Sequence, residues 1–337
     1  IEAGCKPKGI YTLTVPTGGG KTVTSLAFAL HHAVTHGMKR VIYIIPYTSI
    51  IEQNAEVFRN ILGDGNVLEH HSGIEFDLSD GASPEEIRRA LASENWDMPV
   101  VVTTAARFFD SLYANRASKC RKLHNLANSV IIFDEAQMLP LCHLRPCVAA
   151  MASLAEYVGS TLVLCTATQP SLSDLLRTYA PGHTVMELCP QTEEIYDRFR
   201  RVTFRQAGVL EDDALAERLG DHRQVLCVVN SRRAAQQIFD RLPKEGCFHL
   251  STLMIPTQRQ AILEEIRQRL KDGEPCRVVS TSLIEAGVDV DFPTVYRELA
   301  GLDSILQAAG RCNREGKRAA DESIVTVFER TELPPLL

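Results

Sequence analysis

A short glycine-rich segment has residue types that suit phosphate binding. Residues 14–22 read TVPTGGGKT and lie between an apolar run and a helix-like pattern. Glycines leave room for backbone N–H groups to approach phosphate oxygens, and a helix N-terminus adds donors and partial positive charge. Lys21 would reach the β- and γ-phosphates of ATP, and the Thr22 hydroxyl would bind Mg²⁺. The residues expected to bind the nucleotide here are Thr17, Gly18, Gly19, Gly20, Lys21 and Thr22.

A second segment supplies the carboxylates that nucleotide hydrolysis needs. The apolar run 129–133 is followed directly by Asp134 and Glu135. In a parallel sheet both would lie at the carboxyl edge, where ligands bind. We expect Asp134 to hold Mg²⁺ through water, and Glu135 to orient and deprotonate the attacking water. An acidic helix N-cap is the alternative for an isolated pair, but the glycine-rich segment favours the nucleotide site.

Residues 307–314, QAAGRCNR, offer positive charge for the γ-phosphate. Arg311 and Arg314 are three apart, a spacing that predicts a shared helix face. An arginine that reaches the nucleotide from another domain accelerates hydrolysis by about 10³–10⁵ and makes the reaction depend on domain closure. A basic surface helix is the alternative. The expected catalytic residues are Glu135, Arg311, Arg314 and Gln307.

Short apolar segments alternate with longer helix-like patterns, and this rhythm occurs twice along the chain. Fully apolar strands separated by helices are typical of a parallel sheet covered on both faces. The predicted fold is therefore α/β, with two tandem RecA-like domains, each a mostly parallel sheet with helices on both faces. The predicted strands are 10–15, 41–45, 99–103, 129–133, 161–165, 224–229, 247–250, 277–280, 294–298 and 323–328, and the clearest helices are 22–36, 49–61, 232–242 and 256–271.

The composition is that of an average globular protein with room for two domains. The 337 residues exceed the length of one ordinary core, and 45% of them are hydrophobic and 23% charged. The sequence has no apolar run long enough for a membrane span and no secretory signal pattern. It begins without Met, which indicates a processed, excised or internally started segment.

Ten cysteines are present, but none forms a C-x-x-C pair. Disulfide frameworks belong to small secreted chains, and zinc sites need close ligand spacing. We therefore expect reduced, mostly buried thiols in a cytoplasmic protein. The formal net charge of −6 argues against a protein that coats nucleic acid by bulk charge. It does not exclude a groove lined by amides, hydroxyls and a few arginines.

The order of these segments resembles that of superfamily 2 helicases from residue 14 to residue 314. Val15 replaces the first glycine of the usual G-x-x-x-x-G-K pattern, a departure that helicase loops of the form P-T-G-x-G-K-T share. Four strings are closer still to one group, the helicase core of the CRISPR-associated helicase–nuclease of type I systems, particularly the subtype I-C form. They are VIYIIPYTSIIEQN (41–54), LEHHSG (68–73), CTATQP (165–170) and STSLIEAGVDVDF (280–292).

The resemblance implies ATP-driven 3′→5′ translocation on single-stranded DNA, after recruitment to an R-loop bound by a Cascade-type surveillance complex. The family's nuclease is a separate upstream HD domain that uses metal ions. This chain contains no His-Asp dipeptide, so we expect no nuclease activity from it and an HD domain supplied upstream in cis or in trans. The family's C-terminal domain is also expected to be absent, which leaves a helicase core.

Further roles follow from the family's motif positions. Gly287 and Asp289 would lie near the ATP ribose, and Gln137, Thr166 and Thr168 would couple the nucleotide to the nucleic acid. Hydroxyls and amides at other motif positions would hold one strand without reading its sequence, although Ser and Thr also cap helices. The expected nucleic-acid contacts are Tyr47, Thr48, Ser49, Thr103, Thr104, Arg107, Asn230, Ser231, Arg232, Thr281 and Ser282.

The irregular stretch 181–204 contains Pro-Gly and a Pro-Gln-Thr-Glu-Glu run, so we expect the linker near 188–200. The predicted domains are 1–190, with the phosphate loop, Asp-Glu-Ala-Gln and Thr-Ala-Thr, and 191–337, with helicase motifs IV, V and VI. Adjacent histidines on an extended segment point to opposite sides, so His70 and His71 are expected to be structural or to face nucleic acid. Trp96 is expected to pack.

Two other functions remain open on the sequence alone. One is an RNA or DNA helicase of unrelated biology. The other is an ATP-gated nucleic-acid-binding scaffold with little turnover. The scaffold is disfavoured because clamps often lack one catalytic residue, whereas this chain has Lys21, Asp134, Glu135, Arg311 and Arg314.

Overall fold

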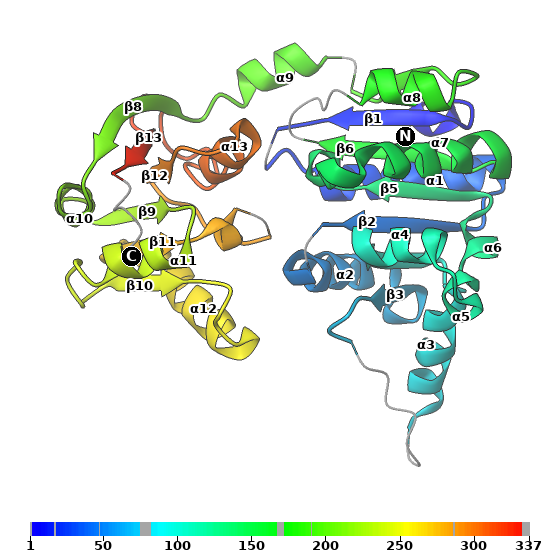
Figure 1. Ribbon diagram of the computed structural model, residues 1–337, viewed down its shortest axis with the longest axis horizontal. Coiled ribbons are helices and arrows are strands. Elements are labelled where there is room, and N and C mark those ends of the chain that lie inside the picture. The colour runs from blue at the N-terminus through cyan, green and yellow to red at the C-terminus, as the bar shows by residue number, and fades with distance from the viewer. Residues whose placement is uncertain are drawn as a thin grey trace. The chain divides into compact units, whose positions relative to one another are not determined.

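The computed structural model describes residues 2–16, 18–46, 48–74, 82–166, 172–189, 191–285 and 287–331 (Figure 1). The chain divides into two compact units, Ile1–Tyr196 and Asp197–Leu337, which we call the first and second lobes. The division expected from the sequence, at 190/191, lies close to this boundary. The predicted linker contains the helix α9 (Thr192–Arg198) where the sequence indicated no regular structure.

The first lobe is built on a seven-stranded sheet of order β3-β4-β2-β5-β6-β1-β7. All of its strand pairs are parallel. The strands are β1 (Ile10–Thr14), β2 (Arg40–Ile45), β3 (Val67–His70), β4 (Val100–Thr104), β5 (Ser129–Phe133), β6 (Thr161–Thr166) and β7 (Val185–Glu187).

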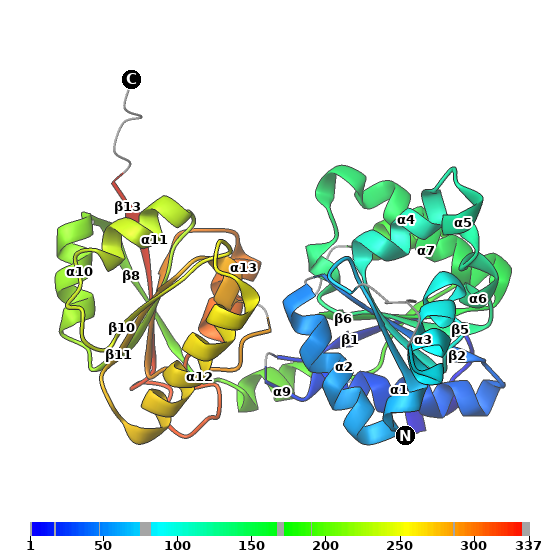
Figure 2. The ribbon, with the colours of Figure 1, turned by 90° about the horizontal axis from the view of Figure 1, so that it is seen from below.

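Helices cover both faces of this sheet, with α1 and α2 on one side and α4 and α7 on the other (Figure 2). Each face has its own apolar cluster because successive strand residues point to opposite sides. In β2, Ile42 and Ile44 join one cluster, whereas Val41, Tyr43 and Ile45 join the other. The helices are α1 (Lys21–His36), α2 (Thr48–Leu62), α3 (Pro84–Asn95), α4 (Ala105–Tyr113), α5 (Ala117–Cys120), α6 (Leu123–Leu126), α7 (Leu144–Val158) and α8 (Ser173–Tyr179).

The second lobe repeats this plan with a six-stranded sheet of order β10-β11-β9-β12-β13-β8, again parallel throughout. Its strands are β8 (Thr203–Leu210), β9 (Gln224–Val228), β10 (Cys247–Leu250), β11 (Cys276–Ser280), β12 (Thr294–Glu298) and β13 (Ile324–Arg330). Its helices are α10 (Asp212–Gly220), α11 (Arg232–Phe239), α12 (Pro256–Asp272) and α13 (Leu302–Ala309).

The second sheet also separates two apolar clusters. In β9, Leu226 and Val228 face the cluster that contains Ile266 of α12, whereas Val225 and Cys227 face the cluster of α10 and α11. The predicted α/β fold with two RecA-like domains is therefore confirmed, and every predicted strand and helix overlaps an observed one. None of the described helices combines the length and apolarity that a membrane crossing requires.

Candidate functional site

The glycine-rich segment forms the turn between β1 and α1. Gly18 and Gly20 both have left-handed backbone angles, with φ of 76° and 77°, which side chains with a Cβ rarely adopt. Gly20 caps the N-terminus of α1, and Lys21 is its first residue. The N–H of Gly19 instead closes the turn on the carbonyl of Pro16 at 3.1 Å. Thr17 lies outside the described residues.

Lys21 lies against the acidic pair that follows β5. Its Nζ is 2.7 Å from Glu135 Oε1 and 3.9 Å from Asp134 Oδ1, and all three side chains are largely buried. Burial lowers the pKa of the Lys21 ammonium, but the two carboxylates outweigh this effect and raise it above its ordinary value. Burial raises the pKa of the Asp134 carboxyl despite the charge of Lys21. The structure thus brings together the three ionised groups that the sequence assigned to nucleotide chemistry.

Glu135 is held in a strained position. Its backbone is left-handed, with φ and ψ both 51°, a conformation that costs a non-glycine residue roughly 1–3 kcal/mol. Gln137 Nε2 donates to Glu135 Oε2 at 2.5 Å, so the residue expected to couple the sites contacts the expected general base. Strain of this kind persists where the surroundings fix a side chain for function.

The donors around Asp134 suit Mg²⁺ held jointly with a nucleotide. Asp134 Oδ2 accepts from the Tyr43 hydroxyl at 3.3 Å, and Oδ1 accepts from the Glu135 N–H at 3.0 Å. Thr22 is half-buried in the first turn of α1. Within the described residues, no group of three or more His, Cys, Asp or Glu side chains forms a metal site of its own. One carboxylate and one hydroxyl fit Mg²⁺ because this ion is commonly completed by water and substrate phosphates.

One residue beside the phosphate loop was not anticipated. Glu187, at the end of β7, accepts hydrogen bonds from the Thr14 N–H at 3.1 Å and the Thr14 hydroxyl at 2.8 Å. Thr166, at the end of β6, accepts through its carbonyl from the Val15 N–H at 3.2 Å. Both contacts fix the chain where it enters the loop. A single Glu at the end of a short strand carries no sequence signal for this role. Thr168 lies outside the described residues.

The expected nucleic-acid residues of the first lobe are partly engaged in the fold. Thr103 Oγ1 donates to the carbonyl of His70 at 2.8 Å, and the Thr104 hydroxyl caps α4 by accepting from the Arg107 N–H at 3.1 Å. Arg107 lies in the first turn of α4. Tyr47 and the side chains of Thr48 and Ser49 lie outside the described residues.

The structural role expected for His70 and Trp96 is supported by their contact. Trp96 is fully buried, as predicted, and its Nε1 donates to His70 Nδ1 at 2.9 Å. Burial lowers the pKa of His70 to about 4, with Lys122 and Arg107 adding to the effect. His71 Nε2 lies 3.0 Å from Glu69 Oε1.

In the second lobe, the expected nucleic-acid residues follow two neighbouring strands. After β9, Asn230 Nδ2 donates to the Leu299 carbonyl at 2.8 Å, and the Ser231 hydroxyl caps α11, where Arg232 is exposed. After β11, Thr281 is buried and its hydroxyl has no hydrogen-bond partner among the described residues. Ser282 opens the 3₁₀ turn Ser282–Ile284.

The prediction that Arg311 and Arg314 share a helix face is wrong. Helix α13 ends at Ala309, and Gly310 ends the helical hydrogen bonding before the chain turns back to pair Cys312 with Phe292. Arg311 is buried and donates to the Ile284 carbonyl at 3.0 Å and the Glu285 carbonyl at 2.6 Å.

Arg314 Nε instead forms an ion pair with Asp289 Oδ1 at 2.6 Å. The predicted catalytic residue and the predicted ribose contact are therefore bound to one another. Gly287 is left-handed, with φ of 72°, and Gln307 lies buried in the last turn of α13.

Comparison with known proteins shows which families the chain resembles. Residues 7–175 match the family DEAD/DEAH box helicase, and residues 221–317 match the family CRISPR-associated nuclease/helicase Cas3, C-terminal. The CRISPR-associated nuclease/helicase Cas3 of Haloferax volcanii is 25% identical over 97% of this chain. The alignment covers 47% of that protein, so the chain spans about half the length of this relative.

Solved structures show the same fold. The crystal structure of T. fusca Cas3 with AMPPNP superposes with a TM-score of 0.77 at 17% identity, over 99% of this chain and 45% of that one. The Mycobacterium smegmatis helicase Lhr bound to ssDNA and AMP-PNP superposes with a TM-score of 0.60 at 17% identity, over 95% of this chain and 44% of that one.

These matches confirm the resemblance to superfamily 2 and to the CRISPR-associated helicases, whereas subtype I-C stays a prediction. The DEAD/DEAH match covers most of the first lobe, including Lys21, Asp134 and Glu135. The Cas3 match covers the turn that contains Arg311 and Arg314. The chain belongs to the DEAD/DEAH box helicase family, and its second lobe matches the C-terminal family of the CRISPR-associated nuclease/helicase Cas3.

Proposed function

We propose that the chain is the ATP-dependent motor of CRISPR type I interference, a translocase that moves on single-stranded DNA, with 3′→5′ polarity. The observation that carries the proposal is the cluster of Lys21, Asp134 and Glu135 beside the left-handed glycines of the phosphate loop. The matches to DEAD/DEAH box and Cas3 families support the nucleic-acid and CRISPR assignments. The proposed setting is the cytoplasm.

In this mechanism the γ-phosphate of bound ATP replaces Glu135 as the ion-pair partner of Lys21. The 2.7 Å ion pair then breaks, and the Glu135 carboxylate becomes free to orient and deprotonate the attacking water. Thr22 and Asp134 would hold Mg²⁺, which supplies charge neutralisation on the phosphates when bound. Gln137 keeps the Glu135 carboxylate in place through its 2.5 Å hydrogen bond.

The second lobe would supply the positive charge that hydrolysis still lacks. We propose that ATP is hydrolysed between the lobes and that their closure brings Arg311, Arg314 and Gln307 to the nucleotide. Arg314 must leave Asp289 to do so. That exchange is inexpensive because the Asp289 side chain is 61% exposed, and exposed ion pairs contribute only about 0–1 kcal/mol. Asp289 and Gly287 would then face the ribose.

Single-stranded DNA would be held by its backbone, through the residues after β2, β4, β9 and β11. The Thr281 hydroxyl has no hydrogen-bond partner among the described residues, and it is buried, so a phosphate would bind it only after this turn has opened. The proposed partners are a Cascade-type surveillance complex and an HD nuclease domain supplied in cis or in trans.

ATPase rates measured with single-stranded DNA, with RNA and with neither test the proposal. We expect DNA to give the fastest rate, and equal rates under the three conditions would rule out the motor. A DNA helicase of other biology is the second candidate, favoured by the structural likeness to helicase Lhr, which was solved bound to ssDNA. Stimulation by free DNA but no response to an R-loop held by a Cascade-type complex would favour that candidate.

A further inference from the structure

Arg297 is a charged side chain buried in the core of the second lobe. It lies in β12, and only 2% of its side chain is exposed. A guanidinium in such a position is strongly unfavourable unless its donors have partners. The residues around Arg297 are therefore expected to provide hydrogen-bond and ion-pair partners for its guanidinium.

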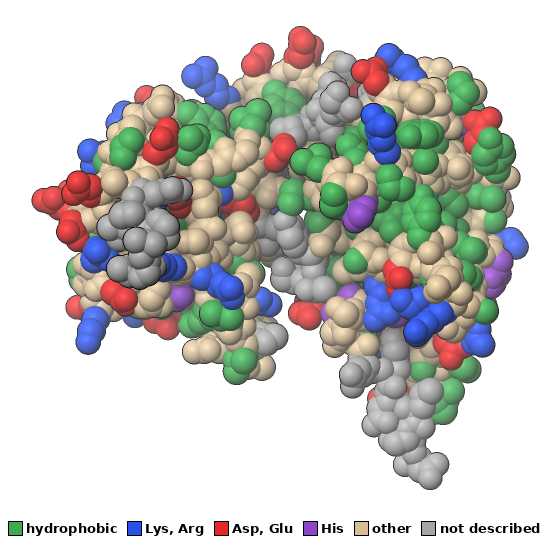
Figure 3. Space-filling model, in the orientation of Figure 1, with side chains coloured by type: hydrophobic (Ala, Val, Ile, Leu, Met, Phe, Trp, Pro, Cys, Tyr) green, Lys and Arg blue, Asp and Glu red, His purple; other side chains and the backbone are tan. Residues whose placement is uncertain are grey.

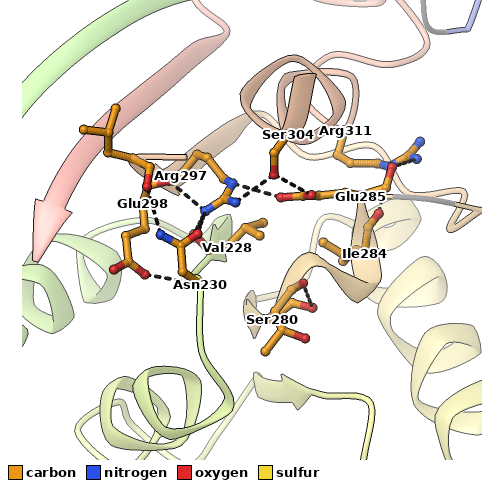
Figure 4. Close-up of polar contacts among 11 residues, drawn as sticks. Val228, Asn230, Ser280, Ile284, Glu285, Arg297, Glu298, Ser304 and Arg311 are labelled. Carbon is orange, nitrogen blue, oxygen red and sulfur yellow. Dashed lines mark hydrogen bonds and ion pairs between the residues drawn. The ribbon is translucent and has the colours of Figure 1, made fainter. Parts of the chain in front are cut away.

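The Arg297 guanidinium joins two turns and helix α13 at the carboxyl end of the sheet (Figure 4). Nη1 donates to Asn230 Oδ1 at 2.8 Å, in the turn after β9. Nη2 donates to Ser304 Oγ at 2.8 Å, in α13. Nε lies 2.9 Å from Glu285 Oε1, in the turn after β11. One side chain thus contacts all three segments.

Glu285 extends these contacts to Arg311. Its carboxylate binds Arg297 through Oε1 and accepts from Ser304 Oγ through Oε2 at 2.7 Å. Its backbone carbonyl accepts from Arg311 Nη2 at 2.6 Å, and the carbonyl of Ile284 accepts from Arg311 Nε at 3.0 Å. The turn that contains Glu285 therefore binds Arg311 through its backbone and Arg297 through the Glu285 side chain.

Asn230, at the other end of the network, also makes hydrogen bonds to neighbouring residues. The Asn230 N–H donates to Glu298 Oε2 at 2.7 Å, and its Nδ2 donates to the Leu299 carbonyl at 2.8 Å. Asn230 therefore cannot move without changing its bond to Arg297. A continuous path of hydrogen bonds and one ion pair runs from Asn230 through Arg297 and Glu285 to Arg311.

We propose that Arg297 is a positioning residue that couples nucleic-acid binding at the Asn230 turn to the placement of Arg311. The proposal rests on the proposed function, which assigns DNA contact to Asn230 and hydrolysis to Arg311. Arg297 and Glu285 are buried, and hydrogen bonds and one ion pair connect them to both turns, so few alternative arrangements exist and a shift at one end is passed to the other. Arg297 itself contacts neither DNA nor nucleotide in this scheme.

The test is the ratio of the ATPase rate with saturating oligo-dT to the rate without DNA, measured on the whole chain. Arg297→Lys keeps a positive charge beside Glu285 but loses the planar fork that reaches Asn230 and Ser304. We expect the ratio to fall by about 5- to 100-fold while the Kd for oligo-dT stays within about twofold. Partial misfolding lowers both rates equally, so a merely structural role leaves the ratio unchanged.

Two further variants complete the design. Ser304→Ala removes the hydroxyl between Arg297 and Glu285 with little change in volume, and we expect a smaller fall in the ratio. Arg40→Lys is the matched control, because Arg40 is also buried and donates to a backbone carbonyl, that of Trp96 at 2.8 Å, but lies in β2 of the first lobe. We expect this control to keep the ratio of the unmodified chain.

Three outcomes would overturn the proposal. The first is a folded Arg297→Lys variant whose ratio matches that of the unmodified chain. The second is a fall in the ratio that higher DNA concentration restores, because the residue would then act only in DNA binding. The third, if Arg297→Lys does not fold, is an unchanged ratio in Ser304→Ala. An unmodified chain that DNA does not stimulate would instead remove the proposed function itself.

Discussion

Each lobe places a basic side chain against a glutamate, but the two ion pairs differ in what surrounds them. Lys21 and Glu135 lie 2.7 Å apart, with 10% and 18% of their side chains exposed. Arg297 and Glu285 lie 2.9 Å apart, with only 2% and 6% exposed. Lys21 has a second carboxylate nearby and a glycine loop beside it, whereas Arg297 has neutral acceptors on its other donors.

The difference shows in which of the two ion pairs a ligand can take the place of the glutamate. Two carboxylates around Lys21 repel each other, and Glu135 has a left-handed backbone, so the first pair is held at a cost. A phosphate can take the place of Glu135 on Lys21. Replacing Glu285 would instead leave a buried guanidinium without its anion. The Lys21–Glu135 pair can therefore open when a phosphate binds, whereas the Arg297–Glu285 pair has to stay closed to hold the turns in place.

Glu→Gln substitutions at Glu135 and Glu285 test most directly whether the two ion pairs differ in this way. We expect Glu135→Gln to lower the ATPase rate by about 10²–10⁴, because the general base is lost. Its free energy of unfolding should fall by less than that of Glu285→Gln, because Asp134 remains to neutralise the buried Lys21. Steady-state rates and urea unfolding check both parts. Full activity in this variant would reject Glu135 as the base.

Glu285→Gln should show the opposite balance. We expect the free energy of unfolding to fall by roughly 2–4 kcal/mol, because the substitution leaves Arg297 buried without its anion. Urea unfolding followed by circular dichroism measures this loss. A loss no larger than that of Glu135→Gln would show that burial does not separate the two pairs.

Acid should destabilise the first lobe through its buried histidines. Burial lowers the pKa of His32 and of His70 to about 4. Between pH 6.5 and 4 the unfolded chain binds protons that the folded lobe does not. The contribution of each histidine is therefore complete above pH 6.5 and falls with decreasing pH, by roughly 2–3 kcal/mol. Urea unfolding at several pH values checks this, and His70→Gln should flatten the profile.

Asp289→Asn is expected to have the smallest effect. The Asp289 side chain is 61% exposed, so losing its ion pair with Arg314 should change the free energy of unfolding by less than about 1 kcal/mol. The same urea assay applies. A loss as large as that of Glu285→Gln would mean that Arg314 is held as firmly as Arg297.

The sequence predicted the parts of the molecule that repeat a simple physical pattern. Apolar strands such as 129–133 and the glycine turn at 18–20 were identified because burial on both faces and left-handed angles restrict residue choice. The strands β3, β7 and β8 were missed. β3 contains buried Glu69 and His70, and β8 is an edge strand with exposed Arg205 and Gln206.

Contacts between residues far apart in the chain could not be predicted. Thr14 and Glu187 meet only because β1 and β7 pair, and no spacing announces this. The helix expected around Arg311 and Arg314 failed for a similar reason. Pairing of Cys312 with Phe292 draws the chain back toward the sheet after Gly310, and local propensity does not report that pairing.

The bond between Glu187 and Thr14 also has a mechanical consequence. β7 is the last strand before the chain continues to α9 and the second lobe, and its final carboxylate holds the residue where the phosphate loop begins. We therefore expect part of any tension along the connecting chain to reach the loop through these two hydrogen bonds, beside the backbone pairing of β7 with β1. We expect nucleotide release under load in an optical trap to become less sensitive to force in Glu187→Gln, and unchanged sensitivity would place the load path elsewhere.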